Sequence, residues 1–291
     1  MRIPRRVVYL ARRRGHGHRL ASFPFVSGDS FRAVATHYVD AGFDPTDLGP
    51  ETCSRPLLFS RACFLEKVYA WALAYPSVAR KARLIIHNCD TINPGDIARL
   101  SPLLSRIASV NWLGPQNLAV PLPIGLENHY INMNGKVQHF EECLPGNRQR
   151  LLAVPRSVNV SAVFSIHTNR SVREPLHRFL CDRPDVNYLR RRIGPKAHRS
   201  LMRNSLFVLS PPGNGPDCHR TWEAMYFGAV PVVLKGSWPF EDESLPVLAV
   251  ETWEAALDFI GDSPLELWQE LVSGTSAAMW MPHYLEKILG P

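Results

Sequence analysis

The sequence predicts an α/β protein built from two αβα domains that face a cleft. Short runs of strand-forming residues alternate with helical patterns along the chain, as in βα units around parallel sheets. The alternation weakens into polar residues, glycine and proline over residues 136–155 and then resumes. We therefore expect an N-terminal domain over residues 1–150 and a C-terminal domain over residues 151–291. Two halves of similar size imply a ligand-binding cleft between them.

Each expected element follows from a local pattern. In the N-terminal domain, apolar and β-branched runs predict strands at residues 23–26, 56–60, 83–88, 107–112 and 120–124. Helical periodicity lies between several of them, notably over residues 31–41 and 65–75. In the C-terminal domain, strands are expected at residues 158–166, 186–189, 205–210 and 230–234. Helices are expected there at residues 174–181, 196–204 and 217–227.

The composition excludes several classes of protein. The 291 residues are 45% hydrophobic and 20% charged, which allows packed cores and excludes general disorder. No apolar run approaches the roughly 18 to 20 residues needed to cross a bilayer. Residues 1–20 also lack the apolar centre of a signal peptide, so we expect a cytoplasmic location. The six cysteines are irregularly spaced without a C-x-x-C pair, which predicts free thiols.

The basic excess is concentrated at the N-terminus. The chain has 33 basic and 26 acidic residues and a net charge of +7. Residues 1–20 contain the arginines Arg2, Arg5, Arg6, Arg12, Arg13, Arg14 and Arg19. Such an arm is usually a solvated tail, and contact with anionic lipid or nucleic acid is the alternative. No aromatic interleaving or nucleic-acid motif accompanies the arginines, so we expect at most an anionic membrane surface as a partner and no nucleic acid.

The most informative segment, residues 205–234, predicts a buried strand, a glycine loop, a helix and a second buried strand. In the loop Gly213-Asn214-Gly215, the glycines allow a sharp turn and close approach of the backbone to a ligand. Asp217 is the expected N-cap of the helix. The helix directs its free N–H groups and positive dipole end at the loop, which favours an anion. His219 and Arg220 in its first turn add donors suited to a phosphate or diphosphate.

Glu223 follows Arg220 by three residues and therefore lies on the same helix face. Its carboxylate can accept hydrogen bonds from neighbouring hydroxyl groups such as those of a ribose. Alternatively, Arg220 and Glu223 form only an intrahelical ion pair and the glycine loop is an ordinary turn. Their combination at the carboxyl end of a parallel strand favours a nucleotide-diphosphate site.

The run S-P-x-G-N-G-x-D-x-H-R-x-W-E-A-x-x-x-G-x-x-P-V-V within this segment resembles the carboxyl-terminal domain of exostosin-like glycosyltransferases and related bacterial surface-polysaccharide transferases. Weaker likenesses lie at residues 23–32, 87–90 and 121–128. The resemblance implies the GT-B architecture, in which two Rossmann-like domains face a cleft. It further implies that the C-terminal domain binds a nucleotide sugar and the N-terminal domain receives the acceptor.

Further donor-site candidates follow the first expected strand of the C-terminal domain. The loop after this strand opens onto the ligand crevice of a doubly wound sheet, so Asn169 and Arg173 are expected to contact the phosphates or the sugar. Arg170 is equally well explained as a surface residue. Lys196 is better explained as a solvated lysine, and Lys235 remains open between the two interpretations.

The candidates for the catalytic base lie in the N-terminal domain. Asp29 follows the expected strand at residues 23–26 and is our first candidate, because an inverting transferase needs a base on the acceptor side. Asp29 could instead cap the following helix, unless Ser30 does so. Glu127 is a second candidate, for the base or for acceptor binding, with a structural hinge contact as the alternative. Asp90 is more typical of a turn.

The chain contains no Asp-x-Asp motif of the kind that holds a divalent ion beside a diphosphate, and residues 241–243 are expected to form a solvated acidic loop. We therefore expect no metal, with arginines and a helix dipole stabilising the departing diphosphate. The leading expectation is a glycosyltransferase that moves a sugar from a nucleotide diphosphate to a polysaccharide or lipopolysaccharide acceptor. The resemblance implies an inverting reaction. The alternatives are a fucosyltransferase-like enzyme, a non-catalytic nucleotide-sugar or glycan-binding module, and a nucleic-acid-binding protein.

Overall fold

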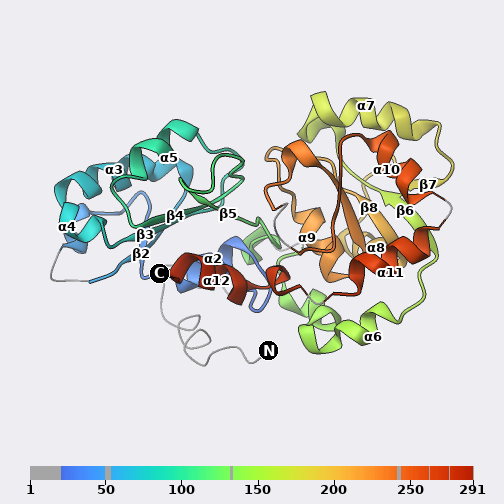
Figure 1. Ribbon diagram of the computed structural model, residues 1–291, viewed down its shortest axis with the longest axis horizontal. Helices are drawn as coiled ribbons and strands as arrows, with labels where there is room; N and C mark the ends of the chain where they lie inside the picture. The colour runs from blue at the N-terminus through green and yellow to red at the C-terminus, as the bar shows by residue number, and fades with distance from the viewer. Residues whose placement is uncertain are drawn as a thin grey trace. The chain divides into compact units, whose positions relative to one another are not determined.

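The chain forms two compact α/β units, described here from a computed structural model (Figure 1). The structure describes residues 21–49, 54–131, 134–240, 244–261, 263–274 and 276–290. Of these, unit 1 contains the residues up to Ile124, Asn128–Tyr130 and the residues from Trp280 onward. Unit 2 contains Gly125–Glu127 and Ile131–Met279. The α/β class with two sheets is therefore confirmed, whereas the boundary expected near residue 150 differs from the division into units.

Unit 1 is built on a fully parallel five-stranded sheet in the order β1-β2-β3-β4-β5. Its strands are β1 (His37–Val39), β2 (Leu57–Ser60), β3 (Arg83–Ile86), β4 (Arg106–Val110) and β5 (Val120–Leu122). The helices of the crossovers are α3 (Leu65–Ala74), α4 (Pro76–Ala79) and α5 (Pro94–Leu100). Because the strands follow one another in order, right-handed crossovers put these helices on one face. Trp71 and Ile97 pack there against Leu58, Leu84 and Ile86.

The other face of this sheet is covered by α2 (Gly28–Val34) and α12 (Met281–Leu289) (Figure 1). The rings of Phe31 and Tyr284 are fully buried, with centroids 6.3 Å apart. Helix α12 packs on β4 and β5. The guanidinium groups of Arg83 and Arg106 donate hydrogen bonds to the carbonyl oxygens of Gly290 and Lys287 at the end of α12. The last helix of the chain thus completes the core of unit 1.

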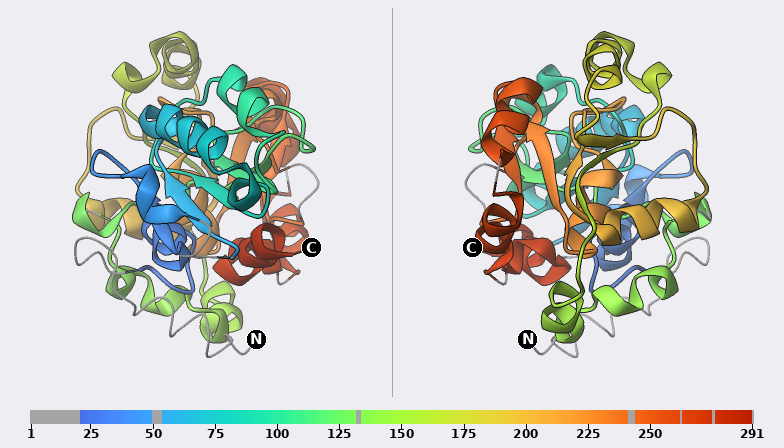
Figure 2. Two further views of the ribbon diagram at one scale, coloured as in Figure 1. Left: turned by 90° about the vertical axis from the view of Figure 1, so that its left-hand side faces the viewer. Right: turned by 90° about the vertical axis from the view of Figure 1, so that its right-hand side faces the viewer.

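Unit 2 contains a second parallel sheet, in the order β10-β9-β8-β6-β7. Its strands are β6 (Val158–Ala162), β7 (Val186–Tyr188), β8 (Ser205–Leu209), β9 (Val230–Leu234) and β10 (Leu248–Val250). Its helices are α6 (Arg148–Leu152), α7 (Arg170–Cys181), α8 (Pro195–Asn204), α9 (His219–Tyr226), α10 (Trp253–Ile260) and α11 (Pro264–Val272). Helices lie on both faces of the sheet, because the direction of the crossovers reverses after β7 (Figure 2). Helices α7, α10 and α11 share one core, and α8 packs beside α9.

Two arginines, the half-buried Arg156 and the buried Arg148, bind the C-terminal ends of α8 and α9. Arg156 donates from Nη1 to the carbonyl oxygens of Arg203 and Ser205 and from Nη2 to that of Phe227, each at 2.8 Å. Arg148 donates to the carbonyl oxygen of Met225 at 2.8 Å. Cations are favourable at helix C-termini, where backbone carbonyls lack intrahelical donors.

Most expected elements are present, and two are wrong. Residues 23–26 form no strand, because Pro24 has no amide hydrogen for a ladder, and Phe25 makes only an isolated bridge to Trp280. The helix expected over residues 31–41 ends at Val34, and β1 follows it. Val34, Thr36 and Val39 are β-branched, which favours an extended chain. The other eight expected strands are present with ends shifted by up to four residues.

Several ends of elements follow directly from local chemistry. The Asn93 side chain accepts from the amide of Gly95 ahead of Pro94 at the start of α5. Thr252 caps α10 by accepting from the amide of Ala255. In the part of the chain that the structure describes, no helix is both long and apolar enough to cross a membrane.

We expect Ile288→Ala to lower the free energy of unfolding of unit 1 by about 2–5 kcal/mol, because a buried aliphatic side chain leaves a cavity. Ile288 is 1% exposed on α12, whereas the adjacent Leu289 is 45% exposed. Leu289→Ala is therefore the matched control and should change stability by less than about 0.5 kcal/mol. Chemical denaturation measures both variants, and equal effects would contradict the packing of α12 in this core.

Candidate functional site

The glycine loop between β8 and α9 is a tight turn packed against its surroundings. The amide of Gly213 donates to the carbonyl oxygen of Gly215 at 3.0 Å. A Cβ atom at Gly213 would lie 3.2 Å from Nη2 of Arg173 and 3.4 Å from Sγ of Cys218. A larger residue at this position would therefore displace its neighbours. Asn214, between the two glycines, is exposed.

Asp217 fixes the start of α9, although it is not the N-cap that the sequence predicted. The N-cap is Cys218, whose amide donates to Oδ1 of Asp217 at 2.8 Å. The indole Nε1 of Trp222 donates to both carboxylate oxygens of Asp217, at 3.1 and 2.9 Å. Asp217 is 3% exposed, so these buried bonds tie the loop to the first turn of the helix.

Arg173 holds the glycine loop by hydrogen bonds to its backbone. Its Nε, Nη1 and Nη2 atoms donate to the carbonyl oxygens of Pro212, Ser165 and Pro211, at 2.8, 2.8 and 3.1 Å. Arg173 is 3% exposed, and burial lowers its pKa to about 10. Asn169 assists by donating from Nδ2 to the carbonyl oxygen of Gly213 at 2.9 Å. Both residues bind carbonyl oxygens of the glycine loop, which gives them a positioning role. Their direct contact with phosphate stays a prediction.

Arg220 is placed differently from Arg173. Its side chain comes from the first turn of α9, and its Nε and Nη1 atoms are buried without a hydrogen-bond acceptor among the described residues. Burial lowers the pKa of this guanidinium. A buried donor that lacks an acceptor is costly, and a buried charge more so. An anion at the start of α9 would remove that cost.

His219 precedes Arg220 and is held by the backbone. Its Nδ1 atom lies 2.7 Å from the carbonyl oxygen of Gly125, and therefore donates a hydrogen bond to it. Gly125 has φ of 64°, a conformation that favours glycine. His219 thus connects α9 to the short segment Gly125–Glu127 within unit 2.

Glu223 is a buried carboxyl group one turn beyond Arg220. It is 2% exposed, and no ion pair within 4.0 Å joins these two described residues, so the intrahelical ion pair considered above is absent. Nδ1 of His198 lies 3.8 Å from Oε2 of Glu223, but burial lowers the pKa of His198 to about 4 and keeps the imidazole neutral. Burial and the nearby carboxylate of Glu127 raise the pKa of Glu223 to about 8. Glu223 is therefore mostly protonated at neutral pH.

A polar cluster in unit 2 surrounds Glu223 and includes three residues that sequence reasoning missed. Asn134 hydrogen-bonds the side chain of Glu223, and its amide donates to Oε2 of Glu127 at 3.0 Å. Arg199 donates from Nη1 to Oδ1 of Asn134 at 2.6 Å. His198 and Arg199 belong to a stretch without acidic residues, and this excess of basic residues could have indicated a binding site. Asn134 stands in a polar segment with no pattern that would single it out. Glu127 belongs to this cluster and not to unit 1, where the sequence placed it.

Asp29 lies in the first turn of α2, in unit 1. It is 2% exposed, and its Oδ2 accepts from the amide of His129 at 2.7 Å. The N-cap is Ser27, whose hydroxyl accepts from the amide of Ser30, so neither Asp29 nor Ser30 caps the helix as considered above. Asp29 joins α2 to the segment that follows β5.

The carboxyl end of β3 lies beside this helix. Asn88 has φ of 59° and accepts from Nδ2 of Asn128 at 2.9 Å. A Cβ atom at Gly28 would be 1.9 Å from Oδ1 of Asn88, so a larger residue there would displace the side chain of Asn88. Non-glycine residues with positive φ are uncommon and often stand near functional sites.

The other candidates are mostly engaged elsewhere. Arg170 pairs with Glu174 at 2.9 Å and is exposed, which confirms the surface interpretation. Lys235 pairs with Glu251 at 3.1 Å. Lys196 is exposed. The backbone carbonyl oxygen of Asp90 accepts a hydrogen bond from Nδ2 of Asn111. The arginine arm, Cys53 and residues 241–243 lie outside the described residues. The described cysteines are free.

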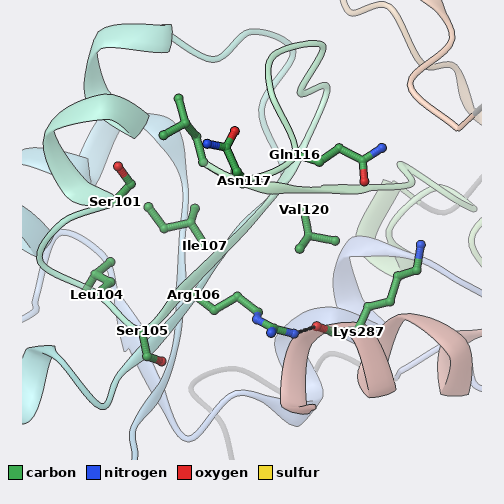
Figure 3. A pocket seen from close by; sticks show the side chains of 11 residues that line it. Ser101, Leu104, Ser105, Arg106, Ile107, Gln116, Asn117, Val120 and Lys287 are labelled. Carbon is green, nitrogen blue, oxygen red and sulfur yellow. Dashed lines mark hydrogen bonds between the residues drawn. The ribbon is translucent and has the colours of Figure 1, made fainter. Parts of the chain in front are cut away.

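One cavity of about 450 Å³ lies in unit 1, at the amino ends of β4 and β5 (Figure 3). It is lined by Arg106, Ile107 and Val120 and by Lys287 of α12, among others, and by none of the described site candidates. Ligands of open α/β sheets bind at the carboxyl ends of the strands instead. Among the described residues, no three His, Cys, Asp or Glu side chains gather closely enough to hold a metal ion. The expected metal independence stays a prediction.

No protein-family model matches the chain, and no curated protein matches it. The resemblance to exostosin-like transferases therefore rests on the sequence run over residues 205–234 and its weaker companions.

We expect the stability of the protein to fall with rising pH because of Glu223. The folded-state pKa of about 8 exceeds the ordinary value of 4.5, so the protonated group stabilises the fold fully below pH 4.5. That contribution is lost progressively up to pH 8, by about 1 kcal/mol per pH unit. Glu223→Gln should remove this slope in denaturation experiments between pH 5 and 8.

The exposed Glu270 supplies the matched control for this pH experiment. Glu270→Gln should leave the slope of the wild-type protein unchanged. A slope that persists in Glu223→Gln would mean that another group titrates.

Proposed function

We propose that this protein is a glycosyltransferase that moves a sugar from a nucleotide-diphosphate donor to a hydroxyl group of a cell-surface glycan. The single observation that carries the proposal lies at the start of α9, where two guanidinium nitrogens of Arg220, Nε and Nη1, are buried without an acceptor among the described residues. The proposal includes a cytoplasmic location and contact of the N-terminal arginines with anionic lipid. The inverting reaction and the GT-B architecture are part of the proposal and rest on the family resemblance.

The donor diphosphate would bind at the glycine loop and the first turn of α9. Arg220 supplies the charge, and the positive end of the α9 helix dipole adds to it. Asn169 and Arg173 hold the loop in place by binding its carbonyl oxygens. These groups would stabilise the negative charge that develops on the diphosphate as it departs, so no metal ion is required.

The ribose would bind at Glu223, on the same helix as Arg220. Two hydroxyl groups of a ribose can donate to one carboxylate. Because Glu223 is mostly protonated at neutral pH without ligand, such binding would release a proton and become tighter as the pH rises toward 8.

In the transfer step, a base removes the proton of the acceptor hydroxyl as its oxygen bonds to the anomeric carbon. The bond from that carbon to the diphosphate oxygen breaks, and the electron pair leaves with the diphosphate. We assign the base to Asp29 of unit 1. The hydrogen bond from the His129 amide to Oδ2 fixes the orientation of this carboxyl group. Glu127 is assigned instead to the donor side, because it lies beside Asn134 and Glu223.

One observation favours a second candidate, a non-catalytic nucleotide-sugar-binding module. Asp29 is only 2% exposed and already accepts a backbone hydrogen bond, as a structural carboxylate would. Both candidates predict nucleotide binding, and only the transferase predicts turnover. A thermal-shift screen of nucleoside diphosphates and nucleotide sugars tests the shared prediction. Transfer assays with glycan acceptors, with and without a chelator, then separate the two.

We expect Arg220→Gln to weaken binding of a nucleoside diphosphate by about tenfold to a hundredfold, because a buried charged donor is lost. Binding of the corresponding nucleoside should change much less. Calorimetry of both ligands measures the difference. Arg170→Gln removes an exposed arginine of the same unit and is the control, with affinity expected to stay unchanged. Equal losses for diphosphate and nucleoside would show that Arg220 does not bind phosphate.

We expect Asp29→Asn to reduce turnover by roughly 10² to 10⁴-fold, because the amide cannot take a proton. The amide oxygen can still accept from the His129 amide, so the melting temperature and the donor affinity should be preserved. Initial rates at saturating donor and acceptor measure the effect. Glu127→Gln is the comparison, and we expect it to change donor affinity more than turnover. Near-normal turnover in Asp29→Asn would exclude Asp29 as the base.

A further inference from the structure

A long stretch of unit 2 is basic and free of acidic residues. Between Asp185 and Asp217 the chain has six Arg and Lys residues and no Asp or Glu. Three of the six are consecutive, Arg190-Arg191-Arg192, in the loop between β7 and α8. The same stretch contains Lys196 and also the glycine loop that precedes α9.

The register of the sheet puts this basic loop at the same edge as the glycine loop. Tyr188 at the end of β7 is aligned with Ala162 of β6, and Ala162 is aligned with Leu209 at the end of β8. The three strands are parallel neighbours, and they lie side by side in Figure 1. With strands about 4.8 Å apart, the two loops leave the sheet about 10 Å from each other.

The arginines of this loop carry charge that the described protein does not neutralise. Arg190 donates from Nη2 to the carbonyl oxygen of Cys181 at 3.1 Å, which holds the start of the loop. Arg191 and Arg192 are exposed, and neither forms an ion pair with a described acidic residue. Lys196 is exposed as well. The nearest acidic residue in sequence, Asp185, already pairs with Arg183 at 2.8 Å.

Exposed charges of this kind act on a ligand before it binds. The screening length is about 10 Å at 0.1 M ionic strength, comparable to the separation of the two loops. A cluster of one sign beside a site raises the local concentration of oppositely charged ligands and their association rate. The exposed charges change the association rate of the ligand, because they act at a distance and need not touch the bound ligand.

We propose that Arg191, Arg192 and Lys196 form an electrostatic collector that captures phosphorylated ligands for the site at the start of α9. The inference rests on the proposed function, because it takes the ligand of that site to be a diphosphate. The collector raises the association rate, whereas the buried Arg220 determines how long the diphosphate stays. The surface therefore selects ligands by negative charge and leaves their base and sugar to the site itself.

The test compares two double variants with the same change of charge. Arg191→Gln/Arg192→Gln removes two exposed cations beside the site, and Arg80→Gln/Lys81→Gln removes two exposed cations of unit 1. The probes are inorganic diphosphate and the nucleoside diphosphate that gives the largest thermal shift with the wild-type protein. Stopped-flow fluorescence of the tryptophans, of which Trp222 lies on α9 with Arg220, follows association and dissociation at 0.05 and 0.5 M salt.

We expect the first double variant to associate about threefold to tenfold more slowly at 0.05 M salt, with an unchanged dissociation rate. At 0.5 M salt the difference should vanish, and Arg80→Gln/Lys81→Gln should match the wild-type protein at both salt concentrations. Normal association of the first variant, or equal slowing in both variants, would overturn the collector and leave the proposed function standing. If the wild-type protein binds neither probe nor any nucleoside diphosphate, both proposals fail.

Discussion

The glycine loop depends on the buried guanidinium of Arg173. Three prolines and two glycines give the loop between β8 and α9 no regular hydrogen-bond ladder, and carbonyl groups left without donors in a buried position are costly. Arg173 supplies donors to the carbonyl oxygens of Ser165, Pro211 and Pro212 at once. Its planar group presents donors in fixed directions, which a lysine does not. The loop is thereby held rigid before any ligand arrives, and α9 starts from a fixed point.

Helix α9 then contains two buried groups of opposite character within one turn. Nε and Nη1 of Arg220 are buried without an acceptor, and Glu223 is a buried carboxyl group with no described Arg or Lys within ion-pair distance. Glu223 avoids carrying a buried negative charge because burial and the nearby Glu127 raise its pKa and keep it protonated. A guanidinium has no such option, because it keeps its proton under ordinary conditions. Arg220 therefore creates the stronger demand for a ligand, and a phosphate or diphosphate meets it in charge and geometry.

The sequence predicted the parallel sheets well because buried parallel strands are continuous apolar runs. It failed where a short segment depended on distant partners. Strand β1 has only three residues and exists because it pairs with β2, and residues 23–26 lack such a partner strand. Helix α12 is amphipathic like any surface helix, so its sequence does not say that it packs on β4 and β5, far earlier in the chain. The division into units differs from the boundary expected near residue 150 for the same reason, because α12 packs on strands far earlier in the chain.

The candidate site was predictable in its position and less so in its roles. Arg173, Arg191 and Arg220 are the same residue type in three different settings. Arg173 binds backbone carbonyl oxygens, Arg191 is exposed, and Arg220 has two buried nitrogens without an acceptor. The three arginines differ in the hydrogen-bond acceptors that lie near them. Pro211 and Pro212 place carbonyl oxygens around Arg173. Arg191 lies in a stretch without acidic residues, and Arg220 lies at the N-terminal end of its own helix, where backbone N–H groups and not carbonyl oxygens are exposed. That supply of acceptors is set by the register of β6, β7 and β8, which brings three loops to one edge. A basic residue at such an edge therefore acquires its role from the loop beside it and not from its own spacing.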